Sequence, residues 1–292
     1  RALGIGLQVG TDTAWTFEPE PTKDVRQILV HAGWDEKKPI LMVCPINGFW
    51  WPVKPSVTKT LLRATTGAYD SDHYASLYFH RGGSEVRLKQ QTYLQNMARA
   101  VRRIQQEQNA FVCVVGMERL DRQACHDFTK LLGTETATFV SDEWDMHELV
   151  MLLRQATWLI SSRYHAIVTS MPQGVLSMGV TMDERIRNLM SDRGQPHLAL
   201  AIDDLDLEEK IYSAWSSMQS HAEEVREGIL CSVASNLGRM GTMGRAFIHY
   251  INERVPTVPV QAEFQSSQDP WTYLPPLSKR LAKIVADYGE MQ

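Results

Sequence analysis

The sequence predicts an α/β protein with a doubly wound parallel sheet, in which buried strands alternate with helices. Two observations carry this prediction. From residue 38 onward, short β-rich runs alternate with amphipathic helical segments. Each β-rich run is apolar along nearly its whole length, as expected of a strand that helices cover on both faces. This alternation favours parallel strands joined by helices.

The predicted strands occupy residues 40–44, 110–115, 136–140, 157–160, 175–178 and 197–201. The helices among them occupy residues 88–106, 121–132, 146–155, 164–171, 183–192 and 207–217. Residues 224–253 form a longer helical pattern, although Gly238, Gly241 and Gly244 argue against its continuity. The prolines that follow end that helix, and residues 277–288 form a last one.

Three parts are expected along the chain. Residues 1–22 are expected to end a domain that lies mostly upstream, because the chain begins inside a run, LGIGLQVG, that is typical of the middle of a domain. Residues 23–253 form the doubly wound domain, and residues 254–292 form a tail. Residues 50–85 combine weak periodicity with many aromatic side chains, so we interpret them as an excursion that covers a site.

Composition excludes several classes of protein. The 292 residues are 43% hydrophobic and 22% charged, as in an ordinary globular protein. A net charge of −4 argues against a surface that binds nucleic acid, although it permits a local basic pocket. The four cysteines form no C-x-x-C pair, which excludes a zinc knuckle and favours a reducing compartment. The chain shows no run as long as the ~20 apolar residues of a membrane span.

Polar and aromatic side chains follow four of the predicted strands. Because the carboxyl ends of parallel strands meet at one edge of a sheet, these residues are expected on one rim, where ligands bind. The candidates are Asn47, Trp50 and Trp51 after the first strand, Glu118 after the second, Arg163 and His165 after the fourth, and Asp183 and Arg185 after the fifth.

Arg163 and His165 have the most specific chemistry of these candidates. An arginine offers a rigid fork of donors suited to a phosphate or carboxylate, and a histidine exchanges a proton near neutral pH. The alternative is structural: Arg163 pairs with an acid such as Asp142 or Asp145, and His165 is a hydrogen-bonded core histidine.

Two further motifs favour structural roles. The glycines of GRMGTMG, residues 238–244, follow no strand, so we interpret them as helix-packing glycines and not as a phosphate loop. The run Asp203, Asp204 and Asp206 opens a helix, where carboxylates cap better than they bind metal.

Residues 158–194, WLISSRYHAIVTSMPQGVLSMGVTMDERIRNLMSDRG, resemble the C-terminal signature of the polysaccharide pyruvyl transferase family. In that family a strand ends in an R-x-H motif, and a helix of small residues, a strand and a D-x-K-like segment follow. The opening GTDTAW, residues 10–15, similarly resembles the family's D-x-A-aromatic segment. The resemblance is good over residues 155–194, fair over 110–133 and absent after 256.

The resemblance implies two facing Rossmann-like domains in a GT-B-like architecture, of which this chain holds mainly the second. It implies phosphoenolpyruvate as donor, and hydroxyls of a glycan or lipid-linked sugar as acceptor. Arg163 and His165 match the motif's arginine and histidine, and Asp183 matches the later aspartate. Arg185 stands where a lysine is usual, which keeps the charge but alters its geometry.

The implied reaction suits these residues. It protonates the methylene of phosphoenolpyruvate, stabilises an oxocarbenium-like carbon, accepts a sugar hydroxyl and releases phosphate. We expect His165 to act as general acid or base, and Arg163 to hold the donor's phosphate or carboxylate. Trp50 or Trp51 would stack on the sugar acceptor. The scheme needs no metal and no cofactor.

The predicted setting is the cytoplasm, with peripheral contact at the inner face of the membrane left open. Two alternatives stay open as well. One is a GT-B glycosyltransferase that uses a nucleotide-sugar donor. The other is a non-catalytic relative that binds a glycan or serves as a scaffold.

Overall fold

The computed structural model describes residues 10–20, 23–69, 77–133, 136–255, 257–259, 264 and 267–289. Six parallel strands form its main sheet in the order β5-β4-β1-β6-β7-β8. Counted along the chain without the short pair β2 and β3, this is the order 3-2-1-4-5-6 of a doubly wound, Rossmann-like domain. The predicted fold class is therefore confirmed for the described part of the chain.

The strands lie close to their predicted positions. They are β1 (Ile40–Cys44), β4 (Phe111–Gly116), β5 (Ala137–Val140), β6 (Trp158–Ser161), β7 (Leu176–Thr181) and β8 (Ala199–Ala201). Every residue of β1, β6 and β7 is buried, as expected of central strands that are covered on both faces. Strand β8 begins two residues later than predicted because a short 3₁₀ turn occupies Pro196–Leu198.

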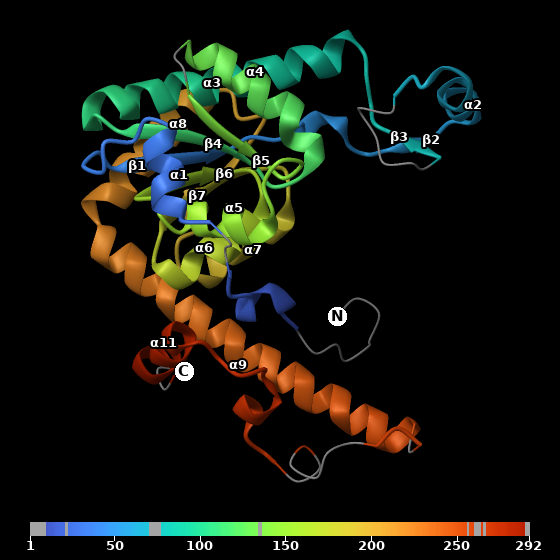
Figure 1. Cartoon of the computed structure of the whole chain (residues 1–292), viewed down its shortest axis with the longest axis vertical. Helices are drawn as coiled ribbons and strands as arrows, with labels where there is room; N and C mark the ends of the chain where they lie inside the picture. Colours follow the sequence, from blue (N-terminus) through green and yellow to red (C-terminus); the bar gives the residue numbers. More distant parts are fainter. Residues whose placement is uncertain are drawn as a thin grey trace.

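Helices cover both faces of the sheet (Figure 1). One layer holds α3 (Ser84–Gln108), α4 (Arg122–Leu132) and α8 (Leu207–Ser220), and α3 packs against the other two. The opposite layer holds α1 (Val25–His31), α5 (Met146–Leu153), α6 (Tyr164–Ser170) and α7 (Glu184–Asp192). Helix α1 was not predicted, because its seven residues are too short for periodicity to register.

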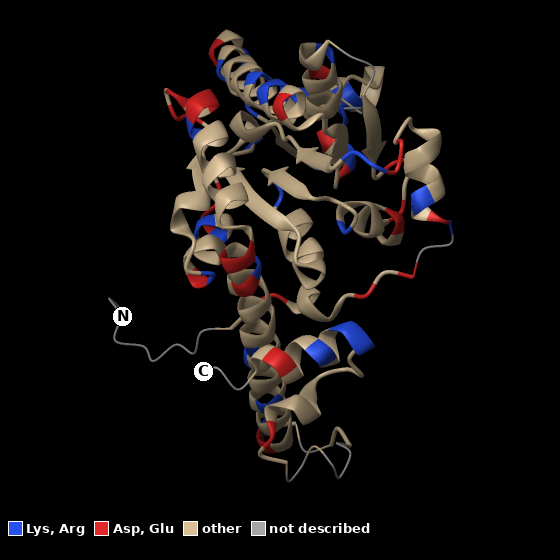
Figure 2. Cartoon of the chain, turned by 90° about the vertical axis from the view of Figure 1, so that its left-hand side faces the viewer, with Lys and Arg blue, Asp and Glu red and all other residues tan. Residues whose placement is uncertain are grey.

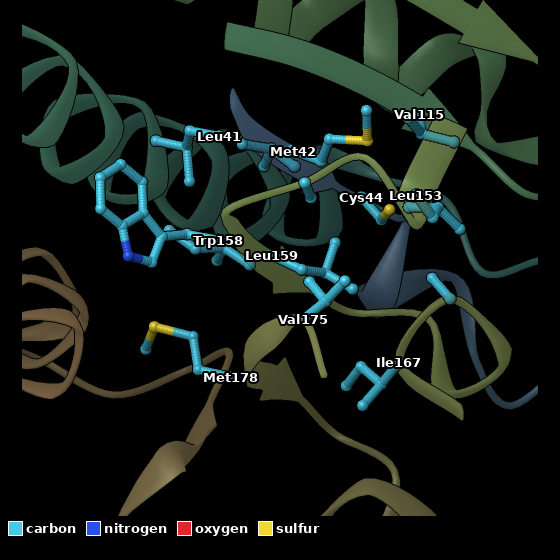
Figure 3. Close-up of a cluster of buried hydrophobic side chains, with 14 of the residues drawn as sticks. Leu41, Met42, Cys44, Val115, Leu153, Trp158, Leu159, Ile167, Val175 and Met178 are labelled. Carbon is cyan, nitrogen blue, oxygen red and sulfur yellow. The ribbon is translucent and has the colours of Figure 1, made fainter. Parts of the chain in front are cut away.

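The core lies between the sheet and these two layers. Figure 3 shows buried side chains of β1, β4, β6 and β7, together with Leu153 of α5 and Ile167 of α6. Cys44 and Cys113 are fully buried and free. Burial raises the pKa of the Cys44 thiol to about 12, so this cysteine is an inert part of the packing.

The excursion forms a small unit at one end of the domain (Figure 1). A 3₁₀ turn at Gly48–Trp50 leads into β2 (Lys54–Pro55) and α2 (Val57–Thr66), and β3 (Tyr78–Phe79) pairs antiparallel with β2. The chain then enters α3, which begins four residues earlier than predicted. Strand β1 and helix α3 thus form the first strand–helix unit of the domain, with the excursion inserted between them.

Helix α9 (Ala222–Arg254) confirms the long helical pattern predicted at residues 224–253, and it is continuous through its three glycines although their low helix propensity argues against continuity. The tail folds back on α9 as a 3₁₀ turn at Pro270–Tyr273 and α11 (Lys279–Tyr288). A Cβ on Gly241 would lie 2.2 Å from the Pro270 carbonyl oxygen, so the close approach requires glycine. The helix-packing interpretation of these glycines is confirmed. Figure 2 shows the tail beside α9, with the lysine and arginine turns of α11 facing outward.

Candidate functional site

The carboxyl rim of the sheet has its reversal of strand order between β1 and β6. Helix α3 leaves β1 on one face, and α6 leaves β6 on the other (Figure 1). In open α/β sheets, ligands bind in the crevice outside such a point, because neighbouring loops diverge there. At this point Arg163 ends the β6–α6 turn and His165 lies in the first turn of α6, on the rim as predicted.

Arg163 is the N-cap residue of α6, and its side chain turns toward the end of β4. Its Nε donates to Oδ2 of Asp121 at 2.8 Å, and its Nη2 also contacts that carboxylate. Its Nη1 lies 3.0 Å from Oε1 of Glu118. The guanidinium thus joins the β6–α6 turn to the β4–α4 turn through two carboxylates.

The acids proposed as structural partners of Arg163 are the wrong ones. Asp142 pairs with Arg122, the first residue of α4, and Asp145 caps α5 by accepting from the backbone N–H of Glu148 at 2.8 Å. The sequence could not distinguish these carboxylates from Asp121, because all of them follow a strand or open a helix. Asp121 is instead the N-cap residue of α4, and Glu118 remains at the rim, as predicted.

Asp121 is the buried member of this cluster, with 1% of its side chain exposed. Burial raises the pKa of its carboxyl above the ordinary value, and the hydrogen bonds from Arg163 oppose that effect. Asn47 supports the same turn, because its Nδ2 donates to the carbonyl of Leu120 at 3.1 Å. The cluster thus places one guanidinium, that of Arg163, between the two carboxyl groups of Asp121 and Glu118.

His165 lies in a different cluster. Its Nε2 is 3.3 Å from Oδ2 of Asp12, and 49% of its side chain is exposed, so the expectation of a core histidine is wrong. Asp12 is fixed in turn, because its Oδ1 accepts from the backbone N–H of Ala14 and caps the 3₁₀ turn Thr13–Thr16. An exposed imidazole next to a fixed carboxylate is suited to proton transfer.

Charged side chains of α7 continue this second cluster. Arg185 donates from Nε to Oδ2 of Asp183 at 2.8 Å, and its guanidinium lies 5.3 Å from the ring centre of Tyr164. Burial acts to raise the pKa of the Asp183 carboxyl, but the hydrogen bonds from Arg185 outweigh it and the pKa is lowered. Asp12, Tyr164 and Arg185 line a hollow of about 470 Å³. Arg185 and Asp183 thus reach the rim as an ion pair.

Arg163 and His165 are one residue apart in sequence but are held by different acids. Asp121 and Glu118 come from the end of β4, whereas Asp12 comes from the N-terminal segment. Both side chains could enter one crevice only if the first turn of the helix were irregular. Helix α6 instead begins regularly at Tyr164, directly after Arg163. We therefore describe two neighbouring subsites, the Arg163 cluster and the His165 cluster.

Comparisons of this chain with protein-family models, curated proteins and solved structures gave no match. The assignment of a function therefore depends on the geometry of the site and on its residues.

The two tryptophans lie at the mouth of the excursion. Trp50 lines a cavity of about 730 Å³ together with Asn47, and its ring centre lies 4.7 Å from that of His80. Trp51 is 48% exposed and lines a neighbouring hollow of about 320 Å³. Neither ring is a buried plug of the core.

Sequence reasoning missed the basic residues of the larger cavity. Lys59, Arg81, Arg87 and Lys130 line its wall. They come from α2, the β3–α3 turn, α3 and α4, so their spacing in sequence gives no signal. The available signal was the run Arg81-Gly82-Gly83-Ser84 directly before a long helix, a composition typical of anion-binding turns.

Within the part of the chain that the structure describes, His, Cys, Asp and Glu side chains form no group of three or more that could hold a metal ion. The acidic run at residues 203–206 accordingly has other contacts, since Asp204 pairs with Lys210 at 2.7 Å. None of the described helices is both long and apolar enough to cross a membrane.

Proposed function

We propose that this chain carries the catalytic rim of a pyruvyl transferase, which transfers the pyruvyl group of phosphoenolpyruvate to sugar hydroxyls as a ketal. One observation carries the proposal. The two segments that resemble the pyruvyl transferase family, residues 10–15 and 158–194, are remote in sequence, yet Asp12 and His165 meet at 3.3 Å. The contact lies beside the reversal of strand order, where a substrate would bind.

In this proposal His165 moves the protons of the reaction. Its exposed imidazole would protonate the methylene carbon of the donor, or accept the proton of the attacking hydroxyl. The carboxylate of Asp12 would orient the ring and stabilise its protonated form. The facing domain of a GT-B-like architecture would supply the other wall of the site.

Arg163 would bind the anionic donor after one of its carboxylates moves. Asp121 is buried and stays in place, whereas 45% of the Glu118 side chain is exposed. A donor carboxylate or phosphate would replace Glu118 at Nη1 and keep the bidentate contact of Arg163 with Asp121 intact. Binding would thus exchange one ion pair for another, without leaving Asp121 unpaired.

A second candidate is a glycosyltransferase that uses a nucleotide sugar. The observation that favours it is the glycine-rich turn before α3, the helix that follows the first strand of the sheet. In dinucleotide-binding domains a turn at this place holds the diphosphate. We rank this function second because it assigns no task to the contact of His165 with Asp12.

The test measures which donor reacts. The full-length protein is incubated with a glycan acceptor and phosphoenolpyruvate, and phosphate release is followed together with the mass of the glycan. A ketal-bearing product supports pyruvyl transfer, whereas nucleotide release from a sugar nucleotide under the same conditions supports the second candidate.

The matched variants are His165→Gln and His249→Gln. His249 on α9 also lies 3.3 Å from a carboxylate, that of Glu253, but it is remote from the rim. We expect phosphate release to fall only in His165→Gln. Equal rates in the two variants would contradict the proposed role of His165.

A further inference from the structure

A cavity lies between α3, α4 and the excursion. It measures about 730 Å³, which is within the usual range for a site that holds a small organic ligand. Its wall combines polar groups with the apolar side chains of Val86, Leu94 and Leu131 and the rings of Trp50 and Tyr69. None of Arg163, His165 or Asp183 lines it, so it is separate from the two rim clusters.

Positive charge dominates the wall of this cavity. Among the described lining residues, Lys59, Arg81, Arg87 and Lys130 face one carboxylate, that of Asp127. Within the described part of the chain, none of these four cations forms an ion pair with a carboxylate. Many other basic side chains of this protein, such as Arg122 and Arg154, do form such pairs. A concave group of cations without counter-ions is suited to an anion.

The start of α3 adds donors to the same wall. Gly83 is its N-cap residue, with a φ of 117°, and makes no side-chain hydrogen bond to the first turn. The backbone N–H groups of that turn therefore lack a capping side chain, and the helix dipole favours negative charge there. A Cβ on Gly82 or Gly83 would meet no atom within 4 Å, so the space beside this backbone is open.

Gln90 supplies an independent indication of a ligand. This residue is 8% exposed, and its Nε2 donates to the carbonyl of Ile46 at 2.7 Å, which fixes the amide. Its Oε1 is buried and accepts no hydrogen bond. Gln90 lines the cavity about two helical turns after the glycines. A buried acceptor without a partner is rare and costly, and a ligand hydroxyl would satisfy it.

We infer that this cavity binds a phosphate ester of a sugar. The phosphate lies at the start of α3 against Arg81 and Arg87, a sugar hydroxyl donates to Oε1 of Gln90, and the apolar side of the ring packs on Trp50. A sugar phosphate has one group for each part of the wall: the phosphate for the cations and the helix start, a hydroxyl for Gln90, and the apolar face of the ring for Trp50. The inference uses none of Arg163, His165 and Asp12, and it shares with the pyruvyl transfer only Trp50, a candidate for stacking on the acceptor sugar.

Titration calorimetry of the full chain, without phosphoenolpyruvate, tests the site. The probes are glucose 1-phosphate, glucose, inorganic phosphate and UDP-glucose, of which the last carries the same ester on a nucleotide. We expect glucose 1-phosphate to bind more tightly than either glucose or inorganic phosphate alone. Tighter binding of UDP-glucose would identify a nucleotide-linked ester as the source of the same chemistry. Inorganic phosphate that binds as tightly as both esters would overturn the inference of a sugar.

Variants locate the binding. Arg81→Gln and Arg87→Gln replace exposed side chains, so the fold is not at risk, and each is expected to weaken glucose 1-phosphate about 10- to 100-fold. Arg102→Gln is the control, because Arg102 is exposed on the same helix and does not line the cavity. His165→Gln should bind the ester like the unmodified protein. Unchanged affinity in both cavity variants, or an equal loss in Arg102→Gln, would overturn the site.

Discussion

Nε2 of His165 lies 3.3 Å from Oδ2 of Asp12, although 153 residues separate the two in sequence. This contact joins the β6–α6 turn to the segment that precedes the domain. It gives the proposed general acid a fixed orientation, since Asp12 is itself held by the backbone N–H of Ala14 at 2.8 Å. The contact therefore predicts different consequences for changes at its two ends.

We expect His165→Gln to lower kcat ~10²–10⁴-fold, because it removes the proton-transfer group, and to leave the KM for phosphoenolpyruvate nearly unchanged. Asp12→Asn keeps an oxygen that caps the 3₁₀ turn but removes the charge next to the imidazole. We expect a smaller loss of kcat from Asp12→Asn. Steady-state kinetics would measure both, and a larger effect on KM than on kcat in either variant would contradict the division of roles.

Changes at Arg163 are expected to affect both stability and binding. Arg163→Met leaves the buried carboxylate of Asp121 without its partner and should lower the free energy of unfolding by about 3–5 kcal/mol. The double variant Arg163→Met with Asp121→Asn should recover part of this loss, because no buried charge remains. Urea unfolding of the wild type, the two single variants and the double variant measures the coupling between the two residues. Losses of stability that simply add would show that the pair is not coupled.

Arg163→Lys separates binding from stability. An ammonium keeps the charge but cannot form the bidentate contact with Asp121 and also reach a donor. We expect a raised KM for phosphoenolpyruvate with little change in kcat. The opposite pattern in His165→Gln is the internal comparison.

Asp121 also predicts how stability depends on pH. Burial raises the pKa of its carboxyl in the folded state, so between the ordinary pKa of 3.8 and the raised value the folded state binds more protons than the unfolded state. The contribution of Asp121 to stability is therefore full below the ordinary pKa and is lost as the pH rises through the folded value. Urea unfolding from pH 3.5 upward should show the wild type losing stability relative to Asp121→Asn over this window. A difference that is constant with pH would refute the assignment.

The glycines of α9 predict opposite effects of the same substitution. Gly241→Ala places a Cβ 2.2 Å from the Pro270 carbonyl oxygen and should displace the tail, whereas Gly238→Ala meets Trp271 at 3.6 Å, an ordinary contact. Gly238→Ala should stabilise the helix by about 0.5–1 kcal/mol. Limited proteolysis should cut residues 267–289 faster in Gly241→Ala alone, and equal protection in both variants would contradict the packing.

The strands could be predicted from sequence because β1, β6 and β7 are buried on both faces and read as uninterrupted apolar runs. The candidates at the rim could be listed for the same reason, since they follow those runs directly. The carboxylates that pair with Arg163 and His165 could not be predicted. Nothing local distinguishes Asp121 from Asp142, or shows that Asp12 reaches His165, because such pairings depend on how remote turns pack.

The basic cavity could not be predicted for a related reason. Its cations lie on four separate elements, and only the fold brings them together. The long helix α9 was predicted, but the reason for its glycines was not visible in the sequence: helix propensity penalises glycine, whereas in this helix the glycines allow the tail to pack closely.

Helix α9 runs for 33 residues, about 50 Å at the rise of an α-helix. Its first half packs in the core through Ile229 and Val233, and farther along, Asn236 accepts from Oγ1 of Thr11 at 2.6 Å. Thr11 is the neighbour of Asp12, so the position of the carboxylate beside His165 is set by the registration of α9 against the N-terminal segment. A tilt of α9 that broke the bond of Asn236 would shift the backbone next to Asp12, so under the proposed function the contact of Asp12 with His165 depends on the docking of a helix outside the rim.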